Sequence, residues 1–299
     1  MIISIVFLSS CELVVDVDVP YDGQKIVVNA VQHPDSLWGV SLSGTKYILE
    51  PGYAYDPINF ADVVIHKPDG STEKLIERGD GYYFGSTRPL PGNNYRITVD
   101  RENYQSVEGE MKMPSVVDII EVEWDSAHAE DGSGGGVIRN GQRLDVPFTI
   151  KFADPVSESN YYSVKVVLYV IREYNRYPDN VTVIDTMQSY AQTYIRDPSI
   201  STDDQSEFSD KTFDGKTVTL PFVAEMQIWD WGTHYKTEVW LMNASEDFFK
   251  YTKTMRLQSE VSGDPFAQPV QVYSNMSNGF GIFSGVVPDV RVFPAPRDE

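Results

Sequence analysis

The chain has 299 residues, of which 41% are hydrophobic and 23% are charged. These values are typical of folded globular proteins and exclude an intrinsically disordered chain. The formal net charge of −20 opposes binding to the phosphate backbone of nucleic acids, and it would also repel an anionic membrane surface. Attachment to a membrane would therefore need a separate device. Aromatic residues make up 12% of the chain, which favours β-structure.

Such a device is predicted at the N-terminus, where an apolar run ends at the single cysteine of the chain. Residues 1–10 are too few to span a bilayer as a helix. Leu8-Ser9-Ser10-Cys11 resembles the lipobox of bacterial lipoproteins, in which a signal peptidase cleaves before a cysteine whose sulfur carries a diacylglyceryl group. Two or three acyl chains on Cys11 would anchor the protein stably. We therefore expect a signal peptide over 1–10 and a lipidated tether over 11–24; the alternative is a buried N-terminal strand with an incidental cysteine.

Residues 25–114 alternate short apolar segments with turn sequences, which predicts a β-sandwich. Strands are expected at 25–31, 38–43, 61–66, 72–77, 82–84 and 95–99, and Tyr95, Ile97 and Val99 should share one face. The order Gly81-Tyr82-Tyr83-Phe84, Leu90-Pro91-Gly92, Tyr95 and Tyr104 resembles immunoglobulin-like and carboxypeptidase-regulatory-like modules. The resemblance implies an immunoglobulin-like domain that ends near Met113-Pro114.

Residues 115–299 are expected to form a second and larger β-sandwich domain, again immunoglobulin-like. Strands are predicted at 116–124, 143–152, 161–174, 181–187, 216–220, 224–228 and 236–242, with Val164, Val166, Leu168 and Val170 on one face. The polar, glycine-rich residues 130–136 are expected at a hairpin tip. Residues 188–212 show no clear period and are interpreted as an irregular insertion that could contact a partner.

One helix is predicted near residues 245–260. Ser245 can cap its N-terminus, and Glu246 and Asp247 would lie at the positive end of the helix dipole. Phe248, Tyr251, Met255 and Leu257 fall on one side. We expect this apolar side to pack on the second sheet as core.

No catalytic residue, metal site or cofactor is predicted. None of the four histidines lies in a zinc-binding arrangement, and the sequence has no nucleophile elbow, P-loop or dinucleotide-binding loop. Residues 203–210 offer carboxylates suited to calcium, but they lack the glycine and glutamate of an EF-hand, so a solvated loop is expected and calcium is the alternative. Trp229 and Trp231 share a strand face near Tyr235 and Trp240. Core packing is the usual role of such a pair, and contact with a sugar ring or a partner is the functional hypothesis kept beside it.

A wider resemblance covers the chain from Cys11 to about Val287. It is carried by Cys11-Glu12, Asp16-Val17-Asp18, Pro20, the segments 26–30 and 34–38, Pro91-Gly92, Tyr95, Tyr104, Pro114, and the segments 272–275 and 279–283. In this order they resemble a family of Bacteroidota outer-membrane lipoproteins that carry domain of unknown function 4249. Members of that family look like partners of SusC-like TonB-dependent transporters. The resemblance implies an outer-membrane protein, lipid-anchored at Cys11, facing the cell surface and bound to a β-barrel transporter.

Three functions follow as hypotheses. The first is an accessory or ligand-capture subunit of a TonB-dependent transporter, without catalytic activity. The second is a structural or assembly lipoprotein of an outer-membrane complex for barrel assembly or secretion. The third is a lipid-anchored hydrolase, which would require carboxylates or histidines that converge in a pocket.

Overall fold

The computed structural model describes residues 23–47, 50, 52, 54–124, 130–131, 142–156, 158–179, 181–200, 202–204, 206–228, 232–262, 266–268 and 270–294. Cys11, the predicted signal peptide, Trp229 and Trp231 lie outside these residues. The described chain is mainly β-structure with one α-helix, and its strands form two hydrogen-bonded sheets. The predicted class, mainly β with a single helix, is confirmed. No helix of the described part combines the length and apolar character needed to cross a bilayer.

The N-terminal residues form two sheets that face each other across one core. Their strands are β1 (Ile26–Gln32), β2 (Gly39–Gly44), β3 (Asp62–His66), β4 (Thr72–Lys74), β5 (Ile76–Glu77), β6 (Tyr82–Phe84), β7 (Asn94–Asp100) and β8 (Val107–Lys112). One sheet contains β1-β2-β6-β5 in this order, and the other contains β8-β7-β3-β4. Tyr95, Ile97 and Val99 share the buried face of β7, as predicted. The ring of the fully buried Trp38 meets Tyr95 edge-on, with centroids 4.8 Å apart.

C-terminal strands complete this N-terminal sandwich. β18 (Met276–Ser277) pairs with β8, and the first part of β19 (Phe280–Pro294) pairs in parallel with β1. Gly281 permits this pairing because its φ is +102° and a Cβ there would lie 1.9 Å from the carbonyl oxygen of Val28. The predicted boundary assigned residues 276–287 to the second domain; in the structure Met276, Phe283 and Val287 pack in the core of the first.

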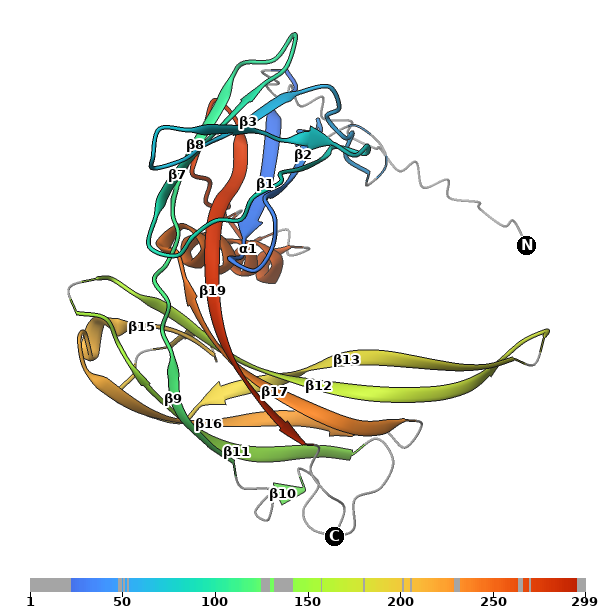
Figure 1. Cartoon of the computed structure of the whole chain (residues 1–299), viewed down its shortest axis with the longest axis vertical. Helices are drawn as coiled ribbons and strands as arrows, with labels where there is room; N and C mark the ends of the chain where they lie inside the picture. Colours follow the sequence, from blue (N-terminus) through green and yellow to red (C-terminus); the bar gives the residue numbers. More distant parts are fainter. Residues whose placement is uncertain are drawn as a thin grey trace, which may run out of the picture.

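The remaining strands form a strongly curled sheet around a second core (Figure 1). They are β9 (Ile119–Trp124), β10 (Glu130–Asp131), β11 (Gln142–Ala153), β12 (Tyr161–Arg176), β13 (Val181–Ile195), β14 (Thr202–Asp204), β15 (Glu207–Ser209), β16 (Thr217–Ile228) and β17 (Thr233–Ala244), with a short 3-10 helix, η2 (Asp210–Thr212). The main order is β10-β11-β16-β13-β12-β17-β19. Val164, Val166, Leu168 and Val170 are buried on one face of β12, as predicted. The last part of β19 pairs with β17, so this single strand joins both halves of the molecule.

Two features of the curled sheet differ from the sequence prediction. β16 is one continuous strand, although residues 221–223 were predicted to interrupt it. Pro221 is tolerated because it lies just beyond Phe222, the last residue that pairs with β13. The predicted insertion 188–212 is partly regular, since β13 continues to Ile195 and β14 and β15 follow.

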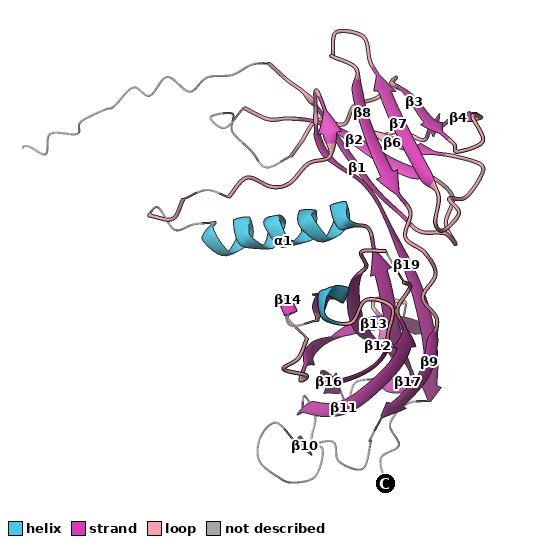
Figure 2. Ribbon diagram, turned by 90° about the vertical axis from the view of Figure 1, so that its left-hand side faces the viewer, coloured by secondary structure: helices cyan, strands magenta, loops and turns pink. Residues whose placement is uncertain are grey.

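The helix α1 (Glu246–Val261) lies between the two halves of the molecule (Figure 2). Ser245 caps it, with its side chain accepting a hydrogen bond from the Phe248 N–H, as predicted. The expected apolar side is only partly buried: Phe249 is the buried residue of the helix and contacts Tyr161 of β12, whereas Met255 is 47% exposed. The helix therefore packs on the curled sheet through Phe249, while most of its apolar side stays outside the core.

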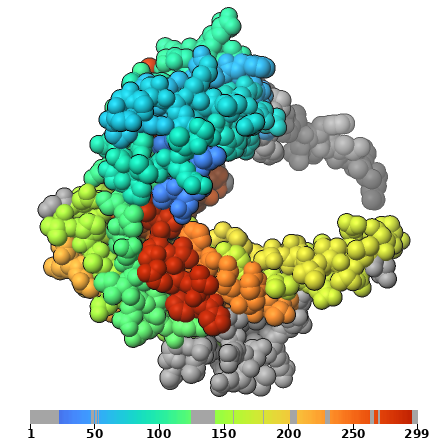
Figure 3. Space-filling model, in the orientation of Figure 1, coloured from blue at the N-terminus to red at the C-terminus, as the bar shows by residue number. Residues whose placement is uncertain are grey.

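β12 and β13 extend beyond their neighbours as a two-stranded ribbon (Figure 1). β12 pairs with β17 up to Ile171, and β13 pairs with β16 only over residues 192–195. Residues 172–179 and 181–185, here called the arm, therefore project from the curled sheet. Figure 3 shows an open hollow between the arm and the N-terminal sandwich.

Candidate functional site

The face of β12 opposite the core looks toward this hollow. Because successive side chains of a strand point to opposite sides, Tyr161, Lys165 and Tyr169 lie on the other face from the core residues Val164 and Leu168. Tyr161 contacts Phe249 of α1, with ring centroids 4.8 Å apart. This outward face is therefore the one that carries α1 and is directed toward the N-terminal sandwich.

Glu238 of β17 organises the polar contacts of the outward face. It is only 8% exposed. Its carboxylate accepts hydrogen bonds from the Tyr169 hydroxyl at 2.8 Å, the Trp240 indole N–H at 3.0 Å and the Lys236 ammonium at 2.8 Å. Burying a carboxylate is costly unless such partners compensate it. The three donors hold two aromatic rings in fixed positions around one charge.

The pKa values in this group follow from the same contacts. Burial alone would raise the pKa of Glu238, but the hydrogen bonds from Lys236, Tyr169 and Trp240 outweigh it and lower the pKa below its ordinary value. Burial and the bond to Glu238 raise the pKa of Tyr169 to about 12. At neutral pH the site therefore contains a carboxylate and a neutral phenol.

Further aromatic rings extend the site toward solvent. Tyr235 meets Tyr169 edge-on with centroids 6.3 Å apart, and the Lys236 ammonium lies 3.6 Å from the centroid of the Tyr169 ring. Tyr190 of β13 and Glu238 lie on either side of Val167 in one cross-strand row. Tyr235 is 40% exposed and Tyr190 is 68% exposed.

We call the set Tyr169, Tyr190, Tyr235, Lys236, Glu238 and Trp240 the aromatic surface. Exposed rings that are held in place lose little conformational entropy on binding, and their faces can stack on sugars, planar rings or partner side chains. The neighbouring ammonium and hydroxyl groups add hydrogen-bond donors. The arrangement is suited to binding.

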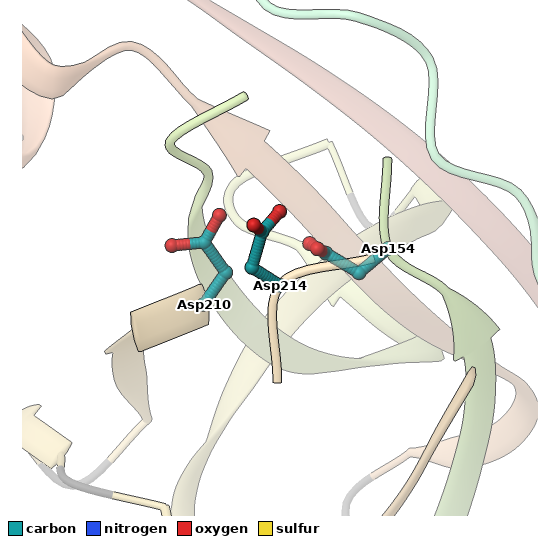
Figure 4. Close-up of side chains that lie close together, drawn as sticks. All are labelled: Asp154, Asp210 and Asp214. Atoms are coloured by element: carbon teal, nitrogen blue, oxygen red, sulfur yellow. The ribbon is translucent and has the colours of Figure 1, made fainter. Parts of the chain in front are cut away.

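A second cluster consists of three aspartates near the end of β11 (Figure 4). Asp154 follows β11, Asp210 lies in η2 and Asp214 lies in the next turn, and one carboxylate oxygen from each lies within 4.8 Å of the others. Asp154 and Asp210 are buried and Asp214 is exposed. Three such oxygens are ligands that a divalent cation would accept.

Protein groups already satisfy the two buried aspartates of this cluster. Asp154 accepts hydrogen bonds from the Tyr162 hydroxyl at 2.5 Å and the Gly215 N–H at 2.8 Å, and Asp210 accepts one from the Asn160 N–H at 2.7 Å. Burial raises the pKa of Asp154 above its ordinary value, against the effect of these bonds. The contacts give the cluster a structural role, tying the end of β11 to the start of β16.

The predicted site residues fall in different places. Cys11, Trp229 and Trp231 lie outside the described residues, so their roles stay predictions. Tyr235 and Trp240, noted beside them in the sequence, belong to the aromatic surface. Sequence reasoning missed Tyr169, Tyr190 and Glu238, because the register of three strands decides which side chains meet.

The acidic residues 203–210 were the remaining sequence candidates. Asp210, from the stretch interpreted as a possible calcium loop, joins Asp154 and Asp214. The side chains of Asp203 and Asp204 lie outside the described set.

Comparison with known proteins gives the family. A family model with the description "Domain of unknown function (DUF4249)" matches residues 13–290. No curated protein matches the sequence. Because the family model covers most of the chain, the chain belongs to the DUF4249 family.

Proposed function

We propose that this protein is an outer-membrane lipoprotein, anchored through Cys11, that acts as an accessory or ligand-capture subunit of a TonB-dependent transporter. The observation that carries the proposal is the aromatic surface, which a nearly buried carboxylate holds in place beside an open hollow. Rigid tyrosine and tryptophan side chains are the usual anchors of ligand and partner surfaces. The lipobox-like Leu8-Ser9-Ser10-Cys11 supports the anchor, and the sequence resemblance supports the partner.

The anchor is tested by fractionating cells that express the wild-type chain or a Cys11→Ala variant. We expect the wild-type protein in the outer-membrane fraction and the variant in the soluble fraction, because the net charge of −20 opposes any other attachment to anionic lipid. A variant that stays in the membrane would overturn the lipid anchor.

The partner is tested by affinity purification of the tagged full-length protein from detergent-solubilised outer membrane, followed by mass spectrometry. A stoichiometric TonB-dependent barrel is the expected result. Components of barrel assembly or secretion would instead favour the structural role. Recovery of the chain alone would contradict both.

The immunoglobulin-like assignment of the N-terminal sandwich is also a proposal. Its support is the pair of facing sheets with a buried tryptophan between them. The parallel pairing of β1 with β19 sets this sandwich apart from a domain that folds from residues 25–114 alone.

A further inference from the structure

The outer edge of β13 is a long strand edge that the sheet leaves open. β13 pairs with β12 over residues 181–191 and with β16 over residues 192–195. In the described part of the chain, residues 181–191 therefore have a strand on one side only. Every second residue of an antiparallel strand directs its N–H and C=O away from its partner. This stretch consequently presents a row of backbone donors and acceptors to solvent.

Several other strand edges in the described part of the chain are protected. β4, β5, β10 and β18 have three residues or fewer. β19 carries Pro288 and Pro294, and Asp289 and Arg291 occupy the N–H and C=O of Ile119 at the edge of β9. Short strands, prolines and charged side chains are the devices that prevent unwanted strand pairing. Residues 181–191 contain neither proline nor lysine.

Four large apolar or aromatic side chains along this edge are exposed. Val181 is 48% exposed, Ile184 70%, Met187 37% and Tyr190 68%. β-branched and aromatic residues of this kind favour extended pairing. The edge thus offers both a backbone ladder and apolar side chains on its two faces.

Charge decides what kind of strand can pair here. Asp185 is the one charged residue of 181–191, and it already pairs with Arg172 across the ribbon at 3.7 Å, so the edge itself is close to neutral. A second copy of this chain would bring another net charge of −20 and would be repelled at long range. An apolar segment of a different protein, with neutral or basic flanking side chains, meets no such repulsion.

We propose that residues 181–191 bind an extended segment of a partner protein as an added β-strand, collinear with β16. Strand addition obtains affinity from main-chain hydrogen bonds and specificity from alternate side chains. The added strand would be the contact through which the proposed function operates. The proposal rests on that function, because it requires a partner protein. The experiment below separates the two.

A photo-reactive phenylalanine analogue is placed at Ile184 or Tyr190 in the full-length protein in its native membrane. Leu90, 62% exposed, and Ile76, 61% exposed, both on the N-terminal sandwich, are the matched control positions. Cross-linked peptides are identified by mass spectrometry. We expect cross-links from positions 184 and 190 to a short extended segment of a barrel protein, at a yield at least tenfold above the controls.

The other possible outcomes show which of the two hypotheses, strand addition or the transporter role, is wrong. Cross-links to a barrel from the control positions alone would overturn the edge proposal and leave the proposed function intact. Cross-links from 184 and 190 to a protein that is no barrel would support strand addition and overturn the transporter role. Absence of cross-links at all four positions would overturn both.

Proline substitution supplies a second test. Of the adjacent residues Gln188 and Ser189, one directs its N–H to β12 and the other directs it outward. We expect one of the variants Gln188→Pro and Ser189→Pro to lose thermal stability. The other should keep its melting temperature yet lose the cross-link at position 184 at least tenfold. A proline variant that keeps both stability and cross-link, beside a neighbour that unfolds, would overturn the proposal.

Discussion

Glu73 is an almost buried carboxylate that holds one end of the N-terminal sandwich together. It accepts hydrogen bonds from the N–H groups of Ser86 at 2.5 Å and Thr87 at 3.1 Å, from both of their hydroxyls, and from the Lys67 ammonium at 2.9 Å. Burial alone would raise the pKa of Glu73, but these donors together lower it to about 2. The charge of this residue is therefore coupled to folding.

The low pKa of Glu73 predicts acid sensitivity. Because the pKa of Glu73 is lowered in the folded state, the ionised carboxylate stabilises the fold. This stabilisation is fully present above the ordinary pKa of 4.5 and is lost as the pH falls toward 2. The full contribution is on the order of 3 kcal/mol. We expect Glu73→Gln to be less stable at pH 7 and to show a flatter loss of stability between pH 5 and 2, measured by urea unfolding. The exposed Glu108→Gln, which removes a surface partner of Arg96, should keep the wild-type profile; equal slopes for all three proteins would refute this role.

The contacts of Glu238 predict that its replacement changes the titration of Tyr169 in the aromatic surface. Burial and the Glu238 carboxylate together raise the pKa of Tyr169 to about 12. Glu238→Gln removes the second cause, so this pKa should fall, as followed by NMR of labelled tyrosine. Loss of charged hydrogen bonds should also cost about 1–3 kcal/mol of stability. Glu260→Gln, which breaks an exposed ion pair with Arg256, should cost less than about 0.5 kcal/mol. An unchanged tyrosine titration would show that Glu238 does not organise the site.

At the scale of elements, the cap of α1 is a local signal with a measurable effect. The Ser245 hydroxyl oxygen accepts from the Phe248 N–H, and the Ser245 backbone N–H donates to the Gly285 carbonyl of β19 at 2.9 Å. We expect Ser245→Ala to lower the unfolding free energy by about 1 kcal/mol. Ser262→Ala, at the exposed opposite end of the helix, should leave it within about 0.3 kcal/mol. Equal effects in thermal unfolding would argue against capping.

Elements with local signals could be predicted from the sequence. The α1 cap, the alternation in β7 and β12, and the turn between β12 and β13 all depend on neighbouring residues. The path of β19 could not be predicted, because its first part pairs with β1 and its last part with β17. Its partners lie far away in the sequence, so no period within residues 280–294 indicates them.

The same reason limits prediction of the candidate site. Trp240 and Tyr235 stand out by residue type, and the sequence singled out their neighbourhood. Tyr169 meets Tyr235, and Tyr190 comes to the same face, only through the register of β12 with β17 and β13, which shifts after Tyr169. The burial of Glu238 likewise follows from its position in the sheet, not from its neighbours in the chain.

At the scale of the whole molecule, β19 makes the two halves dependent on each other. Phe283 is fully buried in the first core, where its ring centroid lies 6.4 Å from that of Trp38. The same strand, β19, continues into the curled sheet. We expect Phe283→Ala to cost about 3–5 kcal/mol and to increase hydrogen exchange in β1 of the first half and also in β17 of the curled sheet, because β19 pairs with both. The exposed Val292→Ala should change stability by less than about 0.5 kcal/mol. Unchanged exchange in β17 after Phe283→Ala would contradict this dependence.

The outward face of the curled sheet and the open edge of β13 at residues 181–191 are the proposed partner-binding surfaces. Hydrogen exchange of the chain, alone and in complex with the barrel that co-purifies with it, tests this most directly. We predict slower exchange in the complex over β12, β13 and β17, centred on residues 181–191. Slower exchange confined to the N-terminal sandwich, or a chain that never associates with a barrel, would contradict it.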